Sequence, residues 1–321
     1  MDRESTSPPG LYRAYAMLGL VMVLWAGNAI VGRAVRFDVP PVTFSFGRWL
    51  LASVLLLPWS VPAVRRDWAV ARKHWRPILA LGVLGIALFN SLLYTGLRHS
   101  TASNAMLIQA SVPAFVLAFD RAIFGQRARP LQILAVIVAI LGVAVIVFQG
   151  DLGRALRLAF SRGDLILVAA AIVWSLYTVL LRLRPVVSPI TVIALTFAVA
   201  ALALAPFAAW EWRSGQVVHW GPGVFGAFAY VALLASLSAY FLFNAAAART
   251  GPVVAGQAIT LLPLFGAVLS ALLLGEVLHL YHLWGMALIV VGIALGAFAA
   301  ARGRPESPSG AMPAARLEDA P

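Results

Sequence analysis

Long apolar runs are the feature of this sequence that most restricts its fold. Between polar or Pro/Gly breaks, apolar residues continue for about 18–23 positions at a time, which is the length of helix needed to cross a bilayer. Apolar residues make up 62% of the chain and charged residues 11%, against roughly 45–50% and 25% in soluble domains. The folding solvent is therefore lipid. A membrane β-barrel is excluded, because its strands alternate in polarity over about ten residues.

The runs predict an all-α membrane protein with ten transmembrane helices. The first five cover residues 15–35, 41–60, 77–97, 102–124 and 130–148, and the second five cover 164–183, 189–210, 224–248, 252–274 and 280–300. Residues 15–148 and 164–300 then form two five-helix repeats joined by an external linker, 149–163. Residues 1–14 form a cytoplasmic tail and 301–321 a disordered cytoplasmic tail. The first run is long enough to be an uncleaved helix rather than a signal peptide.

The basic residues predict the orientation. Of the 24 Lys and Arg residues, 16 fall in one alternating set of tails and loops and 7 in the other, while Arg48 lies inside a helix. Positive residues are retained on the cytoplasmic side, so both termini are expected inside a cell inner membrane. The net charge of +12 therefore reflects topology, and no nucleic-acid partner is expected. The partners expected are the bilayer and a small solute, with the chain a monomer or a homodimer.

The two halves repeat each other in sequence. Trp25 matches Trp174 at a shift of 149 residues, and Pro113 matches Pro263 at a shift of 150. The same shift of 150 relates Phe115 to Phe265, Gly125 to Gly275, Gly142 to Gly292 and Phe148 to Phe298. Each unit has five helices, an odd number, so the second copy is expected to enter the bilayer inverted. Inverted repeats are typical of carriers that expose a central site to each side in turn.

The motifs in these helices resemble those of the EamA-type transporters of the drug/metabolite transporter (DMT) superfamily. The resemblance covers residues 15–300 and rests on the run Leu24-Trp25-Ala26-Gly27-Asn28, on Pro41 with Arg48, on Pro113 with Gly125, on Gly163-Asp164 with Trp174, on Pro263 with Gly275-Glu276, and on Gly285 with Gly292. It implies a ten-helix carrier of small metabolites. It also implies a cavity lined by the first four helices of each half, with the fifth and tenth at the periphery.

The chain departs from that family at the end of the fourth helix. Gly125 is followed by Gln126, where the family usually has glutamate. One carboxylate is thereby lost at the inner face, while a helix-ending role for the glycine remains.

Arg48 is the most costly residue to place in the membrane. An arginine inside a transmembrane helix costs at least about 2.5 kcal/mol and seldom faces lipid. It could bind an anion or carboxylate in the cavity. It could equally be a structural tie, or snorkel to the interface two turns away.

Uncharged polar and aromatic residues at mid-membrane depth are the other candidates for the cavity. They are Asn28, Asn90, Tyr94, Gln109, Tyr177, Tyr240, Asn244 and Gln257. Such side chains should point away from lipid, toward a cavity or only toward a neighbouring helix. Asn90 with Tyr94 and Tyr240 with Asn244 are each four residues apart and share a helix face. Asn90 matches Tyr240 and Tyr94 matches Asn244, as expected of a symmetric lining.

Trp25 and Trp174 lie well inside their helices and are candidate aromatic walls for a planar or cationic solute, or large packing residues. Pro113 and Pro263 interrupt apolar helices and are candidate hinges, or plain kinks. The predicted substrate-binding residues are Trp25, Asn28, Arg48, Asn90, Tyr94, Trp174, Tyr177, Tyr240 and Asn244.

Neither a metal nor a cofactor is expected. Glu276, His279 and His282 have suggestive spacings, but Gly275 marks a helix end beside them. Catalytic motifs are lacking, so an enzyme is not expected. The alternative is an intramembrane enzyme acting on a lipid-linked substrate, and a receptor or scaffold is a second rival. The 12 acidic residues fall in tails, loops or helix ends, with Asp120 and Asp164 closest to the core. Proton coupling through a core carboxylate is therefore disfavoured. Export of an amino acid or similar organic solute is expected, by exchange, by facilitated movement or by coupling through a peripheral group.

Overall fold

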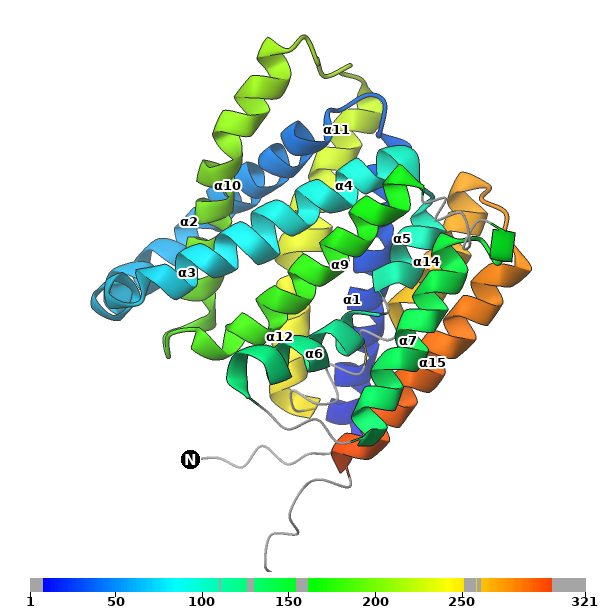
Figure 1. Ribbon diagram of the computed structural model, residues 1–321. Coiled ribbons are helices and arrows are strands. Elements are labelled where there is room, and N and C mark those ends of the chain that lie inside the picture. The colour runs from blue at the N-terminus through cyan, green and yellow to red at the C-terminus, as the bar shows by residue number, and fades with distance from the viewer. Residues whose placement is uncertain are drawn as a thin grey trace, which may run out of the picture.

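A computed structural model describes residues 8–109, 111–125, 130–153, 161–250, 258 and 261–301. The described residues form a helical bundle (Figure 1). Seven of the helical stretches described are long and apolar enough to cross a membrane, and two shorter apolar helices, Ile133–Ile146 and Leu280–Gly292, accompany them. The prediction of an all-helical membrane protein is confirmed. The count of ten helices and the inversion of the halves stay predictions.

The first half follows the predicted order of helices. It contains α1 (Pro8–Ala34), α2 (Pro41–Lys73), a continuous rod of α3 (Trp75–Leu81), η1 (Gly82–Leu88) and α4 (Phe89–His99), and then α5 (Ala102–Gln109), α6 (Val112–Phe124) and α7 (Pro130–Val147). The segment η1 is a π-helix, in which the hydrogen bonds skip one more residue than in an α-helix.

The second half has the same order in its described part. It contains α9 (Arg162–Leu180) with the short η2 (Leu181–Leu183), α10 (Pro189–Arg213), and a rod of α11 (Pro222–Ala229), η3 (Tyr230–Ser238) and α12 (Ala239–Thr250). It ends with α14 (Leu262–Leu274) and α15 (Leu280–Ala301). The segment η3 is again a π-helix, and it overlaps the positions 150 residues after η1.

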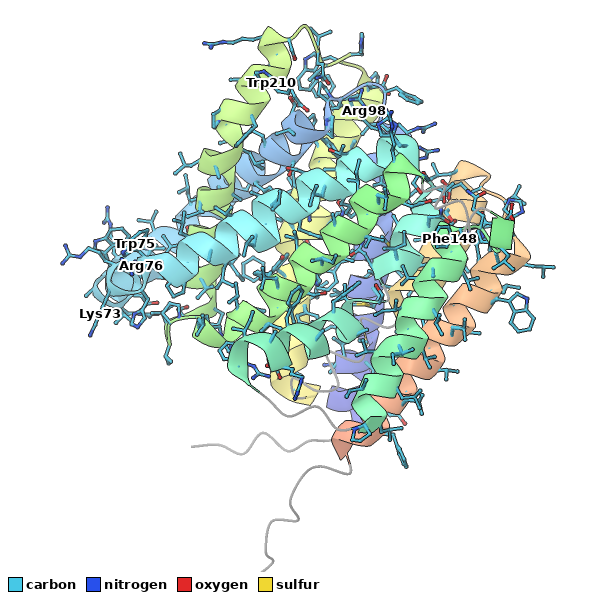
Figure 2. The ribbon with its side chains drawn as sticks, viewed as in Figure 1. Lys73, Trp75, Arg76, Arg98, Phe148 and Trp210 are labelled. Carbon is cyan, nitrogen blue, oxygen red and sulfur yellow. The ribbon has the colours of Figure 1, made fainter. Side chains whose placement is uncertain are left out.

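Two predicted helix boundaries are wrong. The first helix begins at Pro8 instead of residue 15. α2 continues to Lys73 instead of ending at residue 60, with Pro58 and Pro62 inside it. Hydropathy marks the end of an apolar run, whereas a helix can continue into polar surroundings. Figure 2 shows Lys73, Trp75 and Arg76 gathered at the projecting end where α2 passes into α3. Basic and tryptophan side chains of this kind are typical of a membrane interface.

The stretch predicted as one helix over residues 102–124 is an apolar span with those same ends. The structure divides it into α5 and α6, with Ser111 preceding α6. Pro113 then lies in the first turn of α6, where its missing N–H is not needed for the helix ladder. Pro263 has the same place in α14.

Helices of the two halves interleave in a regular way. α2 packs along α10, and α7 along α15 (Figure 1). α4 packs with α9 and α1 with α12, while α6 packs with α9 and α1 with α14. In the repeat, α1, α4 and α6 correspond to α9, α12 and α14. Replacing each helix by its counterpart turns the α4–α9 pair into α1–α12 and the α6–α9 pair into α1–α14. The pairs α2–α10 and α7–α15 stay the same.

Glycines bring α7 and α15 into close contact. A Cβ atom at Gly142 would lie 2.7 Å from the backbone oxygen of Gly285, and one at Gly292 would lie 2.8 Å from the backbone oxygen of Ala135. Both distances are too short for carbon next to oxygen. Small residues at such contacts let helix backbones approach in a membrane.

Candidate functional site

The centre of the bundle holds a buried arginine surrounded by neutral polar groups. Arg48 is 3% exposed. Its Nη1 donates to Asn28 Oδ1 at 2.8 Å, to Asn90 Oδ1 at 2.9 Å and to the Tyr94 hydroxyl at 2.9 Å. These three partners come from α1 and α4. The arginine of α2 therefore ties together three helices of the first half.

The partners of Arg48 are themselves held in place. The Tyr94 hydroxyl donates to Asn28 Oδ1 at 2.7 Å, and Asn90 Nδ2 donates to the backbone oxygen of Ile86 at 3.0 Å. Each amide thus keeps its oxygen turned toward the guanidinium. Asn90 and Tyr94 share a face of α4, as their spacing predicts.

The π-helix η3 supplies the contacts from the second half. Arg48 Nε donates to Ser236 Oγ at 2.8 Å, and Nη2 reaches the backbone oxygen of Ala235 at 3.4 Å. The same oxygen accepts from Trp25 Nε1 at 3.2 Å, and Ser236 Oγ donates to the backbone oxygen of Val231, five residues earlier, at 2.8 Å. Irregular helical turns of this type occur often at functional sites.

Aromatic rings surround the cluster. Trp25 packs against Tyr240 with ring centroids 6.1 Å apart and against Phe243 at 5.3 Å. Trp174 packs against Phe89 at 4.6 Å and against Tyr177 at 4.9 Å. The two tryptophans thus stand on α1 and α9, the first helices of the two halves.

These groups enclose a cavity of about 70 Å³. On this measure a water molecule needs roughly 10–15 Å³, so the space holds about five waters or the head group of a small solute. Its lining residues are Trp25, Asn28, Arg48, Trp49, Phe89, Asn90, Leu93, Met106, Gln109, Trp174, Tyr240 and Leu262. They come from both halves, so the cavity lies between the repeats.

Most of the residues singled out from the sequence lie in or beside this cavity. Trp25, Asn28, Arg48, Asn90, Trp174 and Tyr240 line it. Tyr94 holds Arg48 and Asn28, and Tyr177 packs on Trp174 and covers Gly85, where a Cβ atom would meet its ring at 2.1 Å. The side chains of Asn244, Pro113 and Pro263, and Gln126 and Gln257 entirely, lie outside the described residues. Substrate binding and a hinge role stay predictions.

Sequence reasoning missed three contributors to the site. The face of the Trp49 ring lies 4.4 Å from the Arg48 guanidinium. Phe89 packs against Trp174, and Ser236 accepts a hydrogen bond from Arg48. Trp49 could have been suspected as the neighbour of Arg48, since arginine often lies over an aromatic ring. Ser236 gave no signal, because its reach depends on the π-helical register.

Beyond the cavity, helix connections meet at one end of the bundle, which we call the α4–α5 end. The Glu276 carboxylate, between α14 and α15, accepts from the backbone N–H groups of Ala102 and Ser103 at 3.0 and 3.1 Å and from the Ser103 hydroxyl at 2.9 Å. Arg33, at the end of α1, lies 3.7 Å from the same carboxylate. A carboxylate is favoured here by the N-terminal dipole of α5.

A second polar chain crosses the α4–α5 end. Asp164 accepts hydrogen bonds from the Ser100 hydroxyl and from Asn104 Nδ2, the latter at 3.1 Å. The ring of His282 contacts Asn104 Oδ1 at 2.8 Å and accepts from the His279 N–H at 3.0 Å. Both ring nitrogens of His282 are therefore engaged. The described residues contain no group of three side chains able to hold a metal ion.

Loops close over the same end. Arg98 Nη1 reaches Gln216 Oε1 at 3.4 Å, and the His219 N–H donates to the backbone oxygen of Asp38 at 2.8 Å. Figure 2 shows Arg98 and Trp210 in the upper part of the view, at this end. Contacts between the halves therefore close the α4–α5 end.

Comparison with known proteins gives a consistent result. The EamA-like transporter family matches residues 13–148 and again 161–297, so the chain carries this domain as two repeats. An uncharacterized transporter of Archaeoglobus fulgidus is 26% identical over 88% of this chain and 96% of its own. A probable terminal-alkyne amino-acid exporter of Streptantibioticus cattleyicolor is 29% identical over 89% of this chain and 93% of its own. One solved crystal structure shares the fold with a TM-score of 0.57 at 20% identity, over 90% of this chain and 98% of that one.

Proposed function

This chain belongs to the EamA-like transporter family, and from that premise we propose that it is a secondary transporter that exports a small organic solute by alternating access. The solute is an amino acid or a similar metabolite. The protein spans the cell inner membrane with ten helices in two inverted five-helix repeats. Both termini lie in the cytoplasm, and the α4–α5 end faces outward.

The interleaved helix pairs support the inverted repeat. The α4–α9 and α6–α9 contacts have counterparts in α1–α12 and α1–α14 when the halves are exchanged, and the third rod of each half contains a π-helix, η1 or η3, at overlapping repeat positions. Two copies of one unit, inserted in opposite directions, would produce this set of contacts. Rocking one copy against the other then gives two equivalent states.

The observation that carries the proposal is the position of the cavity. It lies between the repeats, and Arg48 joins α1, α2 and α4 of the first half to η3 of the second. A solute bound there would contact both halves. Its binding would therefore be sensitive to any movement of one half relative to the other.

The contacts at the α4–α5 end correspond to one closed gate. Glu276 caps α5, and Asp164 holds Ser100 and Asn104, in each case joining one half to the other. For transport these bonds must separate, because the cavity has to open toward this end at some stage of the cycle. Exchanging weak polar contacts for water costs little, since the groups regain hydrogen bonds.

Export of an amino acid is proposed partly from the relative in Streptantibioticus cattleyicolor, which is named a probable amino-acid exporter. The cavity supports this class of solute, because aromatic rings, amide oxygens and one arginine can bind both the apolar and the polar parts of such a molecule. The alternative of an intramembrane enzyme gains no support from the described residues, where His282 and Asp164 of the α4–α5 end both bind Asn104 and Glu276 caps α5.

Metabolite measurements in cells and flux measurements in vesicles test the proposal. Extracellular and intracellular amino acids and organic acids are compared between a deletion strain and an overexpressing strain. Solutes that differ are then offered to inside-out membrane vesicles containing the protein. We expect uptake that saturates and that shows counterflow with unlabelled solute. If neither strain differs in any solute and purified protein in liposomes moves none of them, the proposal is wrong.

A further inference from the structure

The positive charge of Arg48 has no acidic partner among the described residues. Every oxygen that it contacts belongs to an amide, a hydroxyl or a peptide group. The internal segments outside the described part, at 110, 126–129, 154–160, 251–257 and 259–260, contain neither Asp nor Glu. No further internal acid is thus available from the sequence to neutralise this arginine.

The acidic residues of the described helices have other partners. Asp67 contacts Thr191, Asp120 contacts Arg182, Asp164 contacts Ser100, Glu211 contacts Thr43 and Glu276 contacts Ser103. Asp38 and Asp151 lie between helices rather than within them. The buried charge of Arg48 is therefore solvated by neutral dipoles alone, an arrangement that an incoming anion would stabilise.

The guanidinium has one nitrogen that is only weakly used. Nη1 has three acceptors within 2.9 Å and Nε has one at 2.8 Å, whereas Nη2 has a single contact with a described residue, at 3.4 Å. Two hydrogens on Nη2 share that one distant acceptor. The hydrogens of Nη2 can therefore donate to a carboxylate oxygen in a charge-assisted hydrogen bond. Arg48 also lines the cavity, so a bound solute could reach it.

The remaining walls define what the rest of the solute can be. Trp25, Phe89, Leu93, Trp174 and Leu262 present rings and aliphatic groups to the cavity, and no acid is among its lining residues. A solute carrying only a positive charge would be repelled by Arg48 and would find no carboxylate. A zwitterion would differ, because its own carboxylate neutralises Arg48 while the ammonium lies against an aromatic face.

We propose that Arg48 forms a carboxylate-binding subsite, so that the cavity takes solutes with one carboxylate and an apolar or aromatic remainder and excludes amines that lack a carboxylate. Asn28, Asn90 and Tyr94 are positioning residues, which hold the guanidinium so that Nη2 faces the carboxylate. The inference rests on the proposed function in taking this cavity as the transport site. Binding itself can be measured without transport.

Matched probes test the subsite on the purified full-length chain. Equilibrium dialysis compares L-phenylalanine, L-leucine and 3-phenylpropionate with their primary amides and with phenethylamine. At least one acid is expected to bind, its amide at least tenfold more weakly, and the amine not at all. Arg48→Gln should weaken binding of that acid at least tenfold. The inference is overturned if no acid binds, if acid and amide bind equally, or if Arg48→Gln binds like the wild type.

A second variant separates binding from folding. Asn28 Oδ1 accepts hydrogen bonds from Arg48 at 2.8 Å and from Tyr94 at 2.7 Å. Asn28→Asp keeps this oxygen and makes it part of a carboxylate. This internal acid should keep the fold at least as stable to heat while it competes with the probe and weakens acid binding at least tenfold. Acid binding that is unchanged in Asn28→Asp would exclude the subsite.

Val186→Glu is the control. It adds an acid in the α9–α10 connection, where Val186 is 99% exposed and outside the cavity lining, and acid binding should not change. Flux in liposomes then distinguishes the two proposals. If acid binding depends on Arg48 but no flux is found, the transport proposal is rejected and the subsite is kept. If amines are transported and Arg48→Gln does not change that flux, the subsite is rejected and the transport proposal is kept.

Discussion

The Glu211 carboxylate, in the last turn of α10, accepts hydrogen bonds from both the backbone N–H and the hydroxyl of Thr43, at 2.7 and 2.8 Å. It thereby caps the first turn of α2. The reverse relationship also exists, because Asp67 of α2 accepts from the Thr191 hydroxyl at 2.7 Å and from the Ser188 N–H at 3.0 Å at the start of α10. Thr43 and Thr191 are 148 residues apart, close to the repeat shift.

Removing the charge of Glu211 should weaken this pair of helices. Glu211 is 3% exposed, and Glu211→Gln replaces one accepting oxygen by an NH₂ group that faces donors. We expect a loss of about 2 kcal/mol in the free energy of unfolding, the usual size for a buried hydrogen bond to a charged group. Thermal unfolding in detergent measures it. Arg213→Gln, an exposed change in the same turn, should have no effect, and equal midpoints for the two variants would contradict the prediction.

Locking the α4–α5 end should stop transport. The hydroxyls of Ser103 on α5 and Ser270 on α14 are 2.6 Å apart, and the natural chain has no cysteine. The double variant Ser103→Cys with Ser270→Cys should lose flux under oxidising conditions and regain it with a reducing agent. Each single variant should be insensitive to the oxidant. A cross-linked protein that transports as fast as the reduced one would argue against alternating access.

The contact between α7 and α15 should not tolerate a methyl group. At Gly292 a Cβ atom would lie 2.8 Å from the Ala135 oxygen and 2.9 Å from the Ala139 nitrogen, both backbone atoms that cannot move alone. Gly292→Ala should therefore lower stability by about 1–3 kcal/mol through overpacking. Gly19 has no atom within 4 Å of the same position, so Gly19→Ala should be neutral or slightly stabilising. Unfolding midpoints in detergent that do not differ would show that the helices can separate freely.

Cysteine labelling should show the orientation. Val217 in the α10–α11 connection is 59% exposed, and Val186 in the α9–α10 connection is 99% exposed. In intact spheroplasts a membrane-impermeant maleimide should label Val217→Cys and should not label Val186→Cys until the membrane is permeabilised. The reverse pattern would place the α4–α5 end in the cytoplasm.

Asp120 should not serve as a proton carrier. It forms a two-pronged ion pair with Arg182, at 2.8 and 3.0 Å, between α6 and η2. This carboxylate is already engaged by a guanidinium on a neighbouring element. Solute flux into liposomes should therefore continue in Asp120→Asn without a change in any accompanying pH signal from an internal dye. A substrate-driven pH change that Asp120→Asn abolishes would show proton coupling.

The sequence predicts the membrane class and much of the polar cluster for clear physical reasons. Lipid demands apolar helices, so hydropathy locates them, and a charged residue such as Arg48 must find inward partners. The spacing of Asn90 and Tyr94 places both on one face, and both contact Arg48. Residues that act through helical periodicity are therefore readable in advance.

Other features depend on long-range geometry that no local pattern encodes. The partnership of Glu211 with Thr43 joins residues 168 positions apart. The roles of Ser236 and of the Ala235 oxygen depend on a change of hydrogen-bond register within η3. The continuation of α2 past residue 60 depends on its solvated surroundings, which hydropathy does not describe.

The two π-helices have a consequence for how the cavity could open. Each residue of an α-helix turns the chain by about 100°. A π-helical segment contains one residue more per hydrogen-bonded turn, so it changes the rotation of the α-helical part on one side relative to the part on the other side. If the π-helical segment moved along the rod, the residues that it left would become α-helical and would rotate about the helix axis. Ser236 and the Ala235 oxygen would then leave Arg48 and Trp25 without any helix being broken. Such a movement would release the guanidinium from Ser236 and from the Ala235 oxygen.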